Sequence, residues 1–255
     1  MSRVLLVGGT GSIGRLVVPR LLELGDEPRV LSRDPSRARL RLGADVAPHV
    51  DVLSGDLTDA GSLTAALDGI DAVVMTHGAP YGSGDYEAID YGAVPALVTA
   101  LGRREVRVAL MSSIGVTGTG GTSRDLLDWK RRGERLLRAS RLPYTIVRPG
   151  WFDAGTGTEE RVDLRQGDRT EYGPVRREHV AETLVQGLHT STAVGRTVEV
   201  FSVDGSPTTD WTGAFASTDP DLPTSLDGAL DAPGLTLDRE PERVQAHLRD
   251  WRTRH

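Results

Sequence analysis

Three glycines near the amino terminus have the spacing of a loop that binds a dinucleotide. Residues 8–14 read GGTGSIG; they follow an apolar run from Arg3 to Val7 and open a stretch with helical spacing. In such a loop the first glycine permits a tight turn, the second lets the backbone approach a diphosphate, and the third lets helix pack on strand. The diphosphate then lies at the helix N-terminus, where unpaired N–H groups favour an anion.

This context favours cofactor binding over the simpler interpretation, a glycine-rich turn without a ligand. The loop residues that we expect to contact the cofactor are Gly8, Thr10, Gly11, Ser12, Ile13 and Gly14.

The end of the second predicted strand favours NADP as the dinucleotide. Ser32 and Arg33 stand where NAD-specific sites often carry an acidic residue, and Arg37 follows one helical turn later. A guanidinium pairs well with a 2′-phosphate. Two alternatives remain open: Asp34 could bind the ribose instead, and the arginines could be the solvated face of a basic helix that also includes residues 39 and 41.

Asp56 follows the third predicted strand and is a candidate to meet the adenine. An Asx turn or a helix cap would explain this aspartate equally well.

Strands and helices alternate along the chain with short connections, and this pattern predicts a doubly wound parallel α/β sheet, a Rossmann fold. We predict strands at 3–7, 28–32, 50–53, 71–76, 106–111, 144–147 and 196–203, and helices between 13 and 25 and over 63–67, 86–101, 124–140, 176–188 and 239–251. We expect one Rossmann-type domain over residues 1–255, with a dinucleotide-binding core at 1–150. The irregular segments 151–175 and 204–255 should form a small cap that contributes to the substrate site.

Composition excludes several classes of protein. The chain of 255 residues contains no cysteine, so it has no disulfide and no thiolate nucleophile or metal ligand. Its net charge of −6 argues against a general nucleic-acid binder, and its apolar runs are too short for a membrane helix. The histidines are scattered without ligand-like spacing, so we expect no metal. With no signal peptide before the first strand, we expect a cytoplasmic protein, either a monomer or a homodimer.

Several sequence blocks together resemble the atypical short-chain dehydrogenases/reductases, in their NAD(P)H-binding, NmrA-like branch. The matching blocks are Gly8–Gly14, Ser32–Arg33, Gly55–Thr58, Met111–Val116, Trp129–Glu134, Tyr144–Gly150 and Val180–Glu182. The resemblance implies an NADP-binding Rossmann domain with a substrate pocket formed by the later loops. It also implies cofactor contacts by Leu57, Thr76, His77, Gly78, Ser112, Lys130, Pro149, Gly150 and Trp151.

The family commonly uses a Tyr-x-x-x-Lys pair and a serine, in which the tyrosine protonates a carbonyl oxygen and the lysine holds the nicotinamide ribose. Lys130 matches the lysine and Ser113 the serine, but Leu126 stands four residues before the lysine. Leucine cannot transfer a proton, so the usual acid is missing from its usual place. We therefore expect Ser113 and Lys130 to form the catalytic set.

Other side chains near the strand ends have both a functional and a structural interpretation. Ser112 and Ser113 could cap a strand, and His77 could be a structural hydrogen-bonder. We expect Tyr81, Trp151 and Phe152 to line the substrate pocket. Trp151 and Phe152, which follow the sixth predicted strand, could equally belong to the hydrophobic core.

These observations predict an NADP-dependent oxidoreductase that acts on a small or medium organic substrate such as a ketone, an enone or a quinone. Two alternatives stay open. One is a non-redox isomerase, dehydratase or epimerase that keeps a bound nucleotide, and the other is an NmrA-like NADP sensor without turnover.

Overall fold

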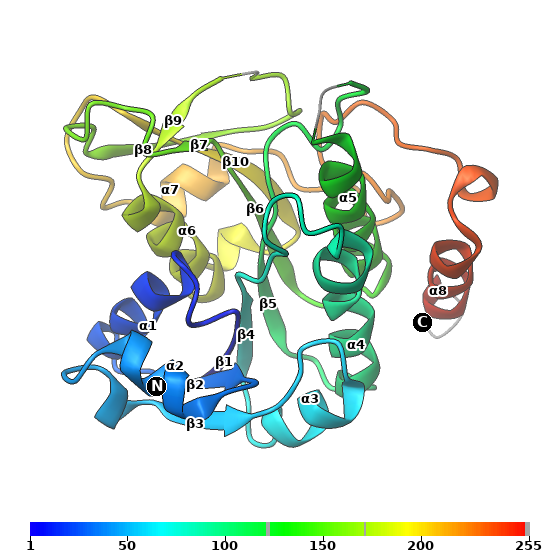
Figure 1. Ribbon diagram of the computed structural model, residues 1–255. Helices are drawn as coiled ribbons and strands as arrows, with labels where there is room; N and C mark the ends of the chain where they lie inside the picture. The colour runs from blue at the N-terminus through cyan, green and yellow to red at the C-terminus, as the bar shows by residue number, and fades with distance from the viewer. Residues whose placement is uncertain (121–122, 171, 253–255) are drawn as a thin grey trace.

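The computed structural model describes residues 1–120, 123–170 and 172–252, which form a twisted sheet with helices on both faces (Figure 1). The main sheet has eight strands in the order β3-β2-β1-β4-β5-β6-β10-β8, and only the edge strand β8 is antiparallel to its neighbour. Its strands are β1 (Arg3–Val7), β2 (Glu27–Ser32), β3 (Asp51–Ser54), β4 (Ala72–Met75), β5 (Arg107–Met111), β6 (Tyr144–Pro149), β8 (Arg161–Arg165) and β10 (Arg196–Val203). The doubly wound α/β fold predicted from the alternation is confirmed.

Both faces of the sheet are covered because its strands are apolar on both sides. In β1, Val4 and Leu6 belong to one buried cluster, and Leu5 and Val7 belong to the other. One face carries α1 (Gly14–Glu23), α2 (Pro35–Leu42), α6 (Arg177–His189) and α7 (Trp211–Ala216). The other carries α3 (Ala60–Ala66), α4 (Ala93–Leu101), α5 (Arg124–Ala139) and α8 (Glu242–Arg252).

The strand order reverses between β1 and β4, and this reversal determines where a ligand binds. The chain winds outward from β1 to β3, then returns to place β4 on the other side of β1. In open α/β sheets the ligand crevice lies at such a switch point, outside the carboxyl ends of the strands. Gly8 and Thr76 follow β1 and β4 at this point, and the Thr76 hydroxyl donates to the Gly8 carbonyl at 3.1 Å.

The helix predicted over 86–101 is interrupted at its start. It begins with a single π-helical turn, η2 (Glu87–Tyr91), in which the Gly92 N–H donates to the Glu87 carbonyl five residues back at 3.0 Å. Pro95 has no N–H, so it cannot continue the regular ladder to the Tyr91 carbonyl. Asp90 lies in this wider turn, and its side chain is buried.

The segment 151–175, predicted as irregular cap, contains strands that the sequence analysis missed. Its β8 extends the main sheet, and β7 (Trp151–Phe152) pairs in parallel with β9 (Pro174–Val175) in a small second sheet. Val162 and Leu164 do alternate with polar residues, but so short a run is a weak strand signal. The segment 204–255 likewise contains α7 before its expected final helix. Positions 171 and 253–255 of these two segments lie outside the described residues.

Candidate functional site

The glycine loop between β1 and α1 fits the diphosphate of a dinucleotide. Gly8 has φ +88°, and a Cβ there would lie 2.6 Å from the backbone nitrogen of His77. A Cβ on Gly14 would lie 2.4 Å from the Gly8 carbonyl oxygen, so the helix can approach the strand only with glycine. A Cβ on Gly11 would meet nothing closer than that oxygen, at 3.2 Å, which leaves the loop open to a ligand. The three glycines thus have the roles expected for a dinucleotide loop.

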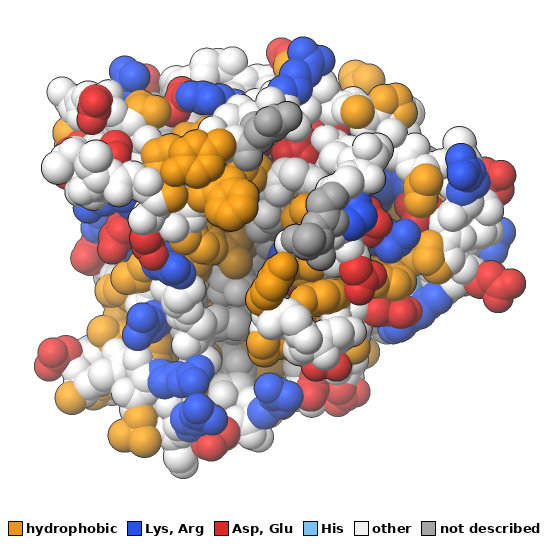
Figure 2. Space-filling model, turned by 45° about the horizontal axis from the view of Figure 1, so that its top comes forward, with side chains coloured by type: hydrophobic (Ala, Val, Ile, Leu, Met, Phe, Trp, Pro, Cys, Tyr) orange, Lys and Arg blue, Asp and Glu red, His pale blue; other side chains and the backbone are white. Residues whose placement is uncertain are grey.

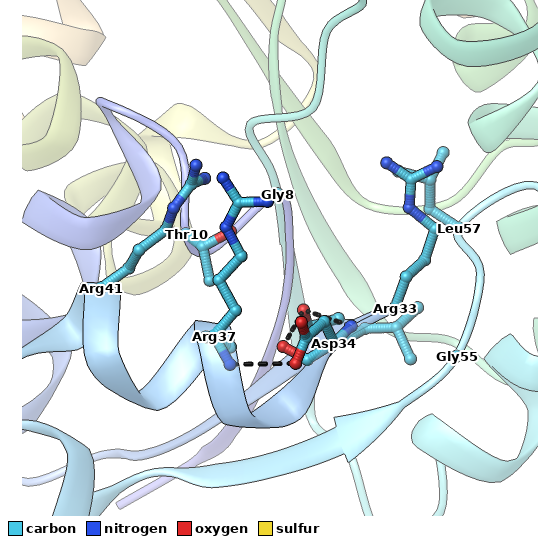
Figure 3. Close-up of a pocket in the computed structure, with 11 residues that line it drawn as sticks. Gly8, Thr10, Arg33, Asp34, Arg37, Arg41, Gly55 and Leu57 are labelled. Carbon is cyan, nitrogen blue, oxygen red and sulfur yellow. Dashed lines mark hydrogen bonds between the residues drawn. The ribbon is translucent and has the colours of Figure 1, made fainter.

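Beside this loop, a cavity of about 220 Å³ lies at the end of β2, and three arginines border it (Figure 3). In Figure 3 the side chains of Arg37 and Arg41 extend toward Thr10 and Gly8, and the side chain of Arg33 lies on the opposite side, beside Leu57. None of the three guanidinium groups forms an ion pair with another described residue. Sequence analysis had placed Arg33 and Arg37 here but had assigned Arg41 only to a solvated helix.

Asp34, the acidic residue that could have bound a ribose, is engaged in local structure. Its carboxylate accepts the backbone N–H of Arg37 at 3.0 Å and so caps the N-terminus of α2. Ser32 Oγ accepts the N–H of Asp34 at 3.2 Å and borders the same cavity. The side chains still directed at the space are therefore predominantly cationic.

Asp56, a candidate to meet the adenine, forms an Asx turn, which is the structural role that its sequence position also predicts. Its carboxylate accepts the backbone N–H of Thr58 at 2.8 Å and the Thr58 hydroxyl at 2.7 Å, and these bonds lower the pKa of Asp56. Leu57, the residue between them, lines the arginine-bordered cavity.

A second cavity, of about 380 Å³, lies on the other side of the glycine loop, at the carboxyl ends of β4, β5 and β6. It brings together most of the residues that the family resemblance implied. Its lining consists of Gly11, Ser12, Thr76, His77, Gly78, Ala79, Asp90, Met111, Ser112, Ser113, Leu126, Lys130, Pro149, Gly150 and Phe152. No tyrosine is among these described lining residues, and Leu126 stands in the wall one helical turn before Lys130.

Lys130 is held at the cavity by a buried carboxylate that sequence analysis missed. Its Nζ lies 2.8 Å from Oδ1 of Asp90, whose side chain is fully buried. The second carboxylate oxygen of Asp90 accepts the backbone N–H of Ala79 at 3.0 Å. Asp90 lies in the π-helical turn η2, and the signal available in the sequence was an acidic residue between the apolar residues Ile89 and Tyr91.

Two polar groups of this cavity, His77 and Ser113, are poor proton donors. Burial, together with the charge of Lys130, lowers the pKa of His77 to about 4, so its ring is neutral at pH 7. The hydroxyl of Ser113 donates to the Ile114 carbonyl at 2.9 Å. Neither His77 nor Ser113 is therefore arranged as a general acid at neutral pH.

Two of the predicted substrate residues lie outside this lining. Tyr81 is 72% exposed, and Trp151 is 57% exposed with its ring 6.3 Å from that of Tyr172. Phe152 does line the cavity, because successive strand residues point to opposite sides. The prediction that Trp151 contacts the cofactor is therefore not supported by its position. Figure 2 shows an apolar patch beside the hollow that runs down this face of the molecule.

A family model described as NAD(P)H-binding matches residues 8–191, which is more than half of the chain. The chain belongs to this NAD(P)H-binding family, among the atypical short-chain dehydrogenases/reductases. The predicted family is thereby confirmed.

Solved structures of the same type agree with the fold. A Bacillus halodurans protein, provisionally described as an NAD-dependent epimerase/dehydratase, superposes with a TM-score of 0.73 at 25% identity. The match covers 86% of this chain and all of that protein.

Curated relatives include a reductase. Sanguinarine reductase of Eschscholzia californica is 28% identical over 72% of this chain and 83% of its own length. An uncharacterised chloroplastic protein of Arabidopsis thaliana is 28% identical over 83% of this chain and 74% of its own length. NAD(P) binding and general kinship to oxidoreductases follow from these matches.

The expectation of a cytoplasmic protein is contradicted by the relatives of this chain. The Arabidopsis relative is named as chloroplastic, and so is protein TIC 62 of Pisum sativum, which is 28% identical over 81% of this chain and 44% of its own length. Relatives of this chain therefore occur in plastids, and the lack of a signal peptide before the first strand does not identify the compartment.

The described residues contain neither a membrane-spanning helix nor a cluster of metal ligands. Within residues 1–120, 123–170 and 172–252 no helix is both long and apolar enough to cross a bilayer. In the same part of the chain no three His, Asp or Glu side chains gather as a set of metal ligands.

Proposed function

We propose that this protein is an NADPH-dependent reductase of a small or medium organic substrate. The observation that carries the cofactor preference is the arginine-bordered cavity beside the glycine loop. Arg33, Arg37 and Arg41 supply positive charge where a 2′-phosphate would lie, while the nearby carboxylates of Asp34 and Asp56 accept hydrogen bonds from Arg37 and Thr58. Guanidinium groups bind phosphate through paired, charge-assisted hydrogen bonds.

Reductive chemistry is supported by the second cavity. A bound reduced nicotinamide supplies a hydride. Lys130, fixed by Asp90, would hold the ribose hydroxyls, and Thr76 and Ser112 would border the ring at the strand ends. Met111, Leu126 and Phe152 give the same cavity apolar walls that exclude water from the reacting atoms.

The lack of a tyrosine in this lining selects among acceptors. A simple ketone needs a proton at its oxygen as the hydride arrives, and neither neutral His77 nor Ser113 is arranged to donate one. A conjugated acceptor, either an enone or a quinone, spreads the arriving charge over its π system and takes its proton from water afterwards. We therefore propose conjugated carbonyl compounds as the substrates.

The cofactor preference is tested by removing one arginine. Arg37→Ala should raise the dissociation constant of NADP⁺ about 10- to 100-fold, the cost of a lost hydrogen bond to a charged group, and leave that of NAD⁺ unchanged. Isothermal titration calorimetry measures both constants. Arg39→Ala is the matched control, because Arg39 lies on the same helix outside the cavity lining. Equal losses for both dinucleotides, or parental affinity for NADP⁺, would contradict the proposal.

Turnover is tested with NADPH and a panel of a naphthoquinone, a cyclic enone and cyclohexanone, by following the absorbance of the reduced nicotinamide. We expect consumption with the first two and at least 100-fold slower consumption with the third. NADPH that binds but is never consumed would identify a sensor, and substrate conversion without a net change in the cofactor would identify a non-redox enzyme.

A further inference from the structure

Arg177 reaches from the carboxyl-terminal half of the chain to the glycine loop. It is the first residue of α6, and its Nη1 donates to the hydroxyl of Ser12 at 2.8 Å across 165 positions of sequence. Ser12 is exposed, and it belongs both to the glycine loop and to the lining of the second cavity. A side chain of α6 thus lies against the element that fits a diphosphate.

The position of the Arg177 guanidinium is fixed by two further contacts. Its Nε lies 2.8 Å from Oδ2 of Asp153, and its central carbon lies 4.6 Å from the centre of the Phe152 ring. Only 32% of the side chain is exposed. The Arg177 guanidinium is therefore held by β7, by the turn after β7 and by the glycine loop. It still has N–H groups that can donate to a ligand.

Helix stability does not explain an arginine at this place. A cation in the first turn of a helix meets the positive end of the helix dipole, which is unfavourable. The glycine loop itself, residues 8–14, contains no lysine or arginine. Lys130, on the far side of the second cavity, already pairs with Asp90. Beside the loop, Arg177 is therefore well placed to meet an anion.

We propose that Arg177 is a ligand of the dinucleotide's diphosphate, binding it from the side of α6 while the glycine loop binds it through backbone N–H groups. The fork of an arginine matches phosphate oxygens. Since the same guanidinium covers one face of Phe152, which lines the second cavity, cofactor binding also fixes a wall of the substrate site. This inference rests on membership of the NAD(P)H-binding family and not on a preference for NADP.

The test measures affinity by calorimetry and needs no turnover. Arg177→Ala should raise the dissociation constants of NADP⁺ and NAD⁺ by the same factor, about 10- to 100-fold, because both carry the diphosphate. Adenosine 2′-monophosphate, which lacks the diphosphate, should bind as tightly as to the parent protein. This pattern differs from that of Arg37→Ala, so the failure of one proposal is distinguishable from the failure of the other.

The neighbouring arginine supplies the matched control. Arg176 is 30% exposed and pairs with Glu160, away from the loop, so Arg176→Ala should leave both dissociation constants within about twofold of the parent. Arg177→Lys keeps the charge but not the fork and should show a smaller loss, which tests the idea if the alanine variant folds poorly. Parental affinity of Arg177→Ala for both dinucleotides would overturn the proposal, as would losses equal to those of Arg176→Ala.

Discussion

At the scale of single residues, the second cavity, at the carboxyl ends of β4, β5 and β6, shows how burial changes the chemistry of a side chain. His77 is a plausible acid by residue type, yet it lies buried beside the ammonium group of Lys130. Both effects disfavour a charged imidazole ring, and burial is the larger of the two. The same environment suits Lys130, whose charge is matched by the Asp90 carboxylate. The cavity thus keeps one paired cation and one neutral histidine.

The neutral state of His77 predicts how stability depends on pH. Its pKa falls from an ordinary 6.5 to about 4 in the folded protein, so between these values only the unfolded chain binds the proton. The free energy of unfolding should therefore fall as the pH falls through this window. From pH 7 to pH 5 this group should contribute a loss of about 2 kcal/mol.

Urea denaturation at the two pH values, compared between the parent and His77→Gln, measures this contribution. From pH 7 to pH 5, the free energy of unfolding of His77→Gln should fall by about 2 kcal/mol less than that of the parent. The exposed His49 provides the control, since His49→Gln should keep the parental slope. The same slope in His77→Gln and the parent would show that His77 does not titrate in this way.

At the scale of elements, the glycine loop joins three pieces of structure with little space between them. Gly8 fits against the end of β4, and Gly14 fits against the backbone of Gly8 and Gly9. The loop geometry that admits a diphosphate is therefore the geometry that packs α1 onto β1. Cofactor affinity and local packing should fail together when this contact is disturbed.

Gly14→Ala should disturb it, because the new methyl group would lie 2.4 Å from the Gly8 carbonyl oxygen and 2.6 Å from the Gly9 Cα. Both contacts are backbone, so no flexible side chain can move aside. We expect a loss of about 1–3 kcal/mol in the free energy of unfolding and a weaker complex with NADP⁺. Gly120→Ala is the control, since no atom of the described residues is found within 4 Å of a Cβ there. Chemical denaturation and calorimetry would show both effects, and parental values for Gly14→Ala would contradict this account.

At the scale of the whole molecule, a buried ionic network attaches the carboxyl-terminal segment to the sheet. Arg148 of β6 forms paired hydrogen bonds with Glu134 of α5 and with Asp231, at 2.7–2.9 Å. Arg138 of α5 binds Asp221 at 3.1 Å. Burial alone would raise the pKa of Glu134, but Arg148 and Arg138 lower it to about 2. Pro149 and Gly150, which follow Arg148, line the second cavity, so the network also supports that site.

Asp231→Ala tests this support, because it leaves half of the buried Arg148 guanidinium without its partner. Removal of one member of a buried ion pair costs about 3–5 kcal/mol, and we expect a loss of this size in urea denaturation. Asp204 is exposed, so Asp204→Ala should change the free energy of unfolding by less than about 0.5 kcal/mol. Equal effects of the two substitutions would mean that the network contributes little.

The sequence by itself determined most elements of the central sheet and the position of the glycine loop. The apolar run of β1, the glycine spacing after it and the helical periods depend on residues a few positions apart, and β1 and β10 occupy the predicted ranges. The arginines at the end of β2 were also readable, because they follow a strand whose end lies beside the loop. Alternation of short elements then leaves few possible arrangements of a parallel sheet.

Only the tertiary structure decided which distant side chains meet. The Asp90 carboxylate faces Lys130 through a π-helical turn, and Arg177 reaches Ser12 across 165 positions. The short segment β8 forms a strand because it pairs with β10. Such contacts arise from chain packing between segments with no periodic relation in sequence, so local spacing predicts the cofactor loop while packing decides what surrounds it.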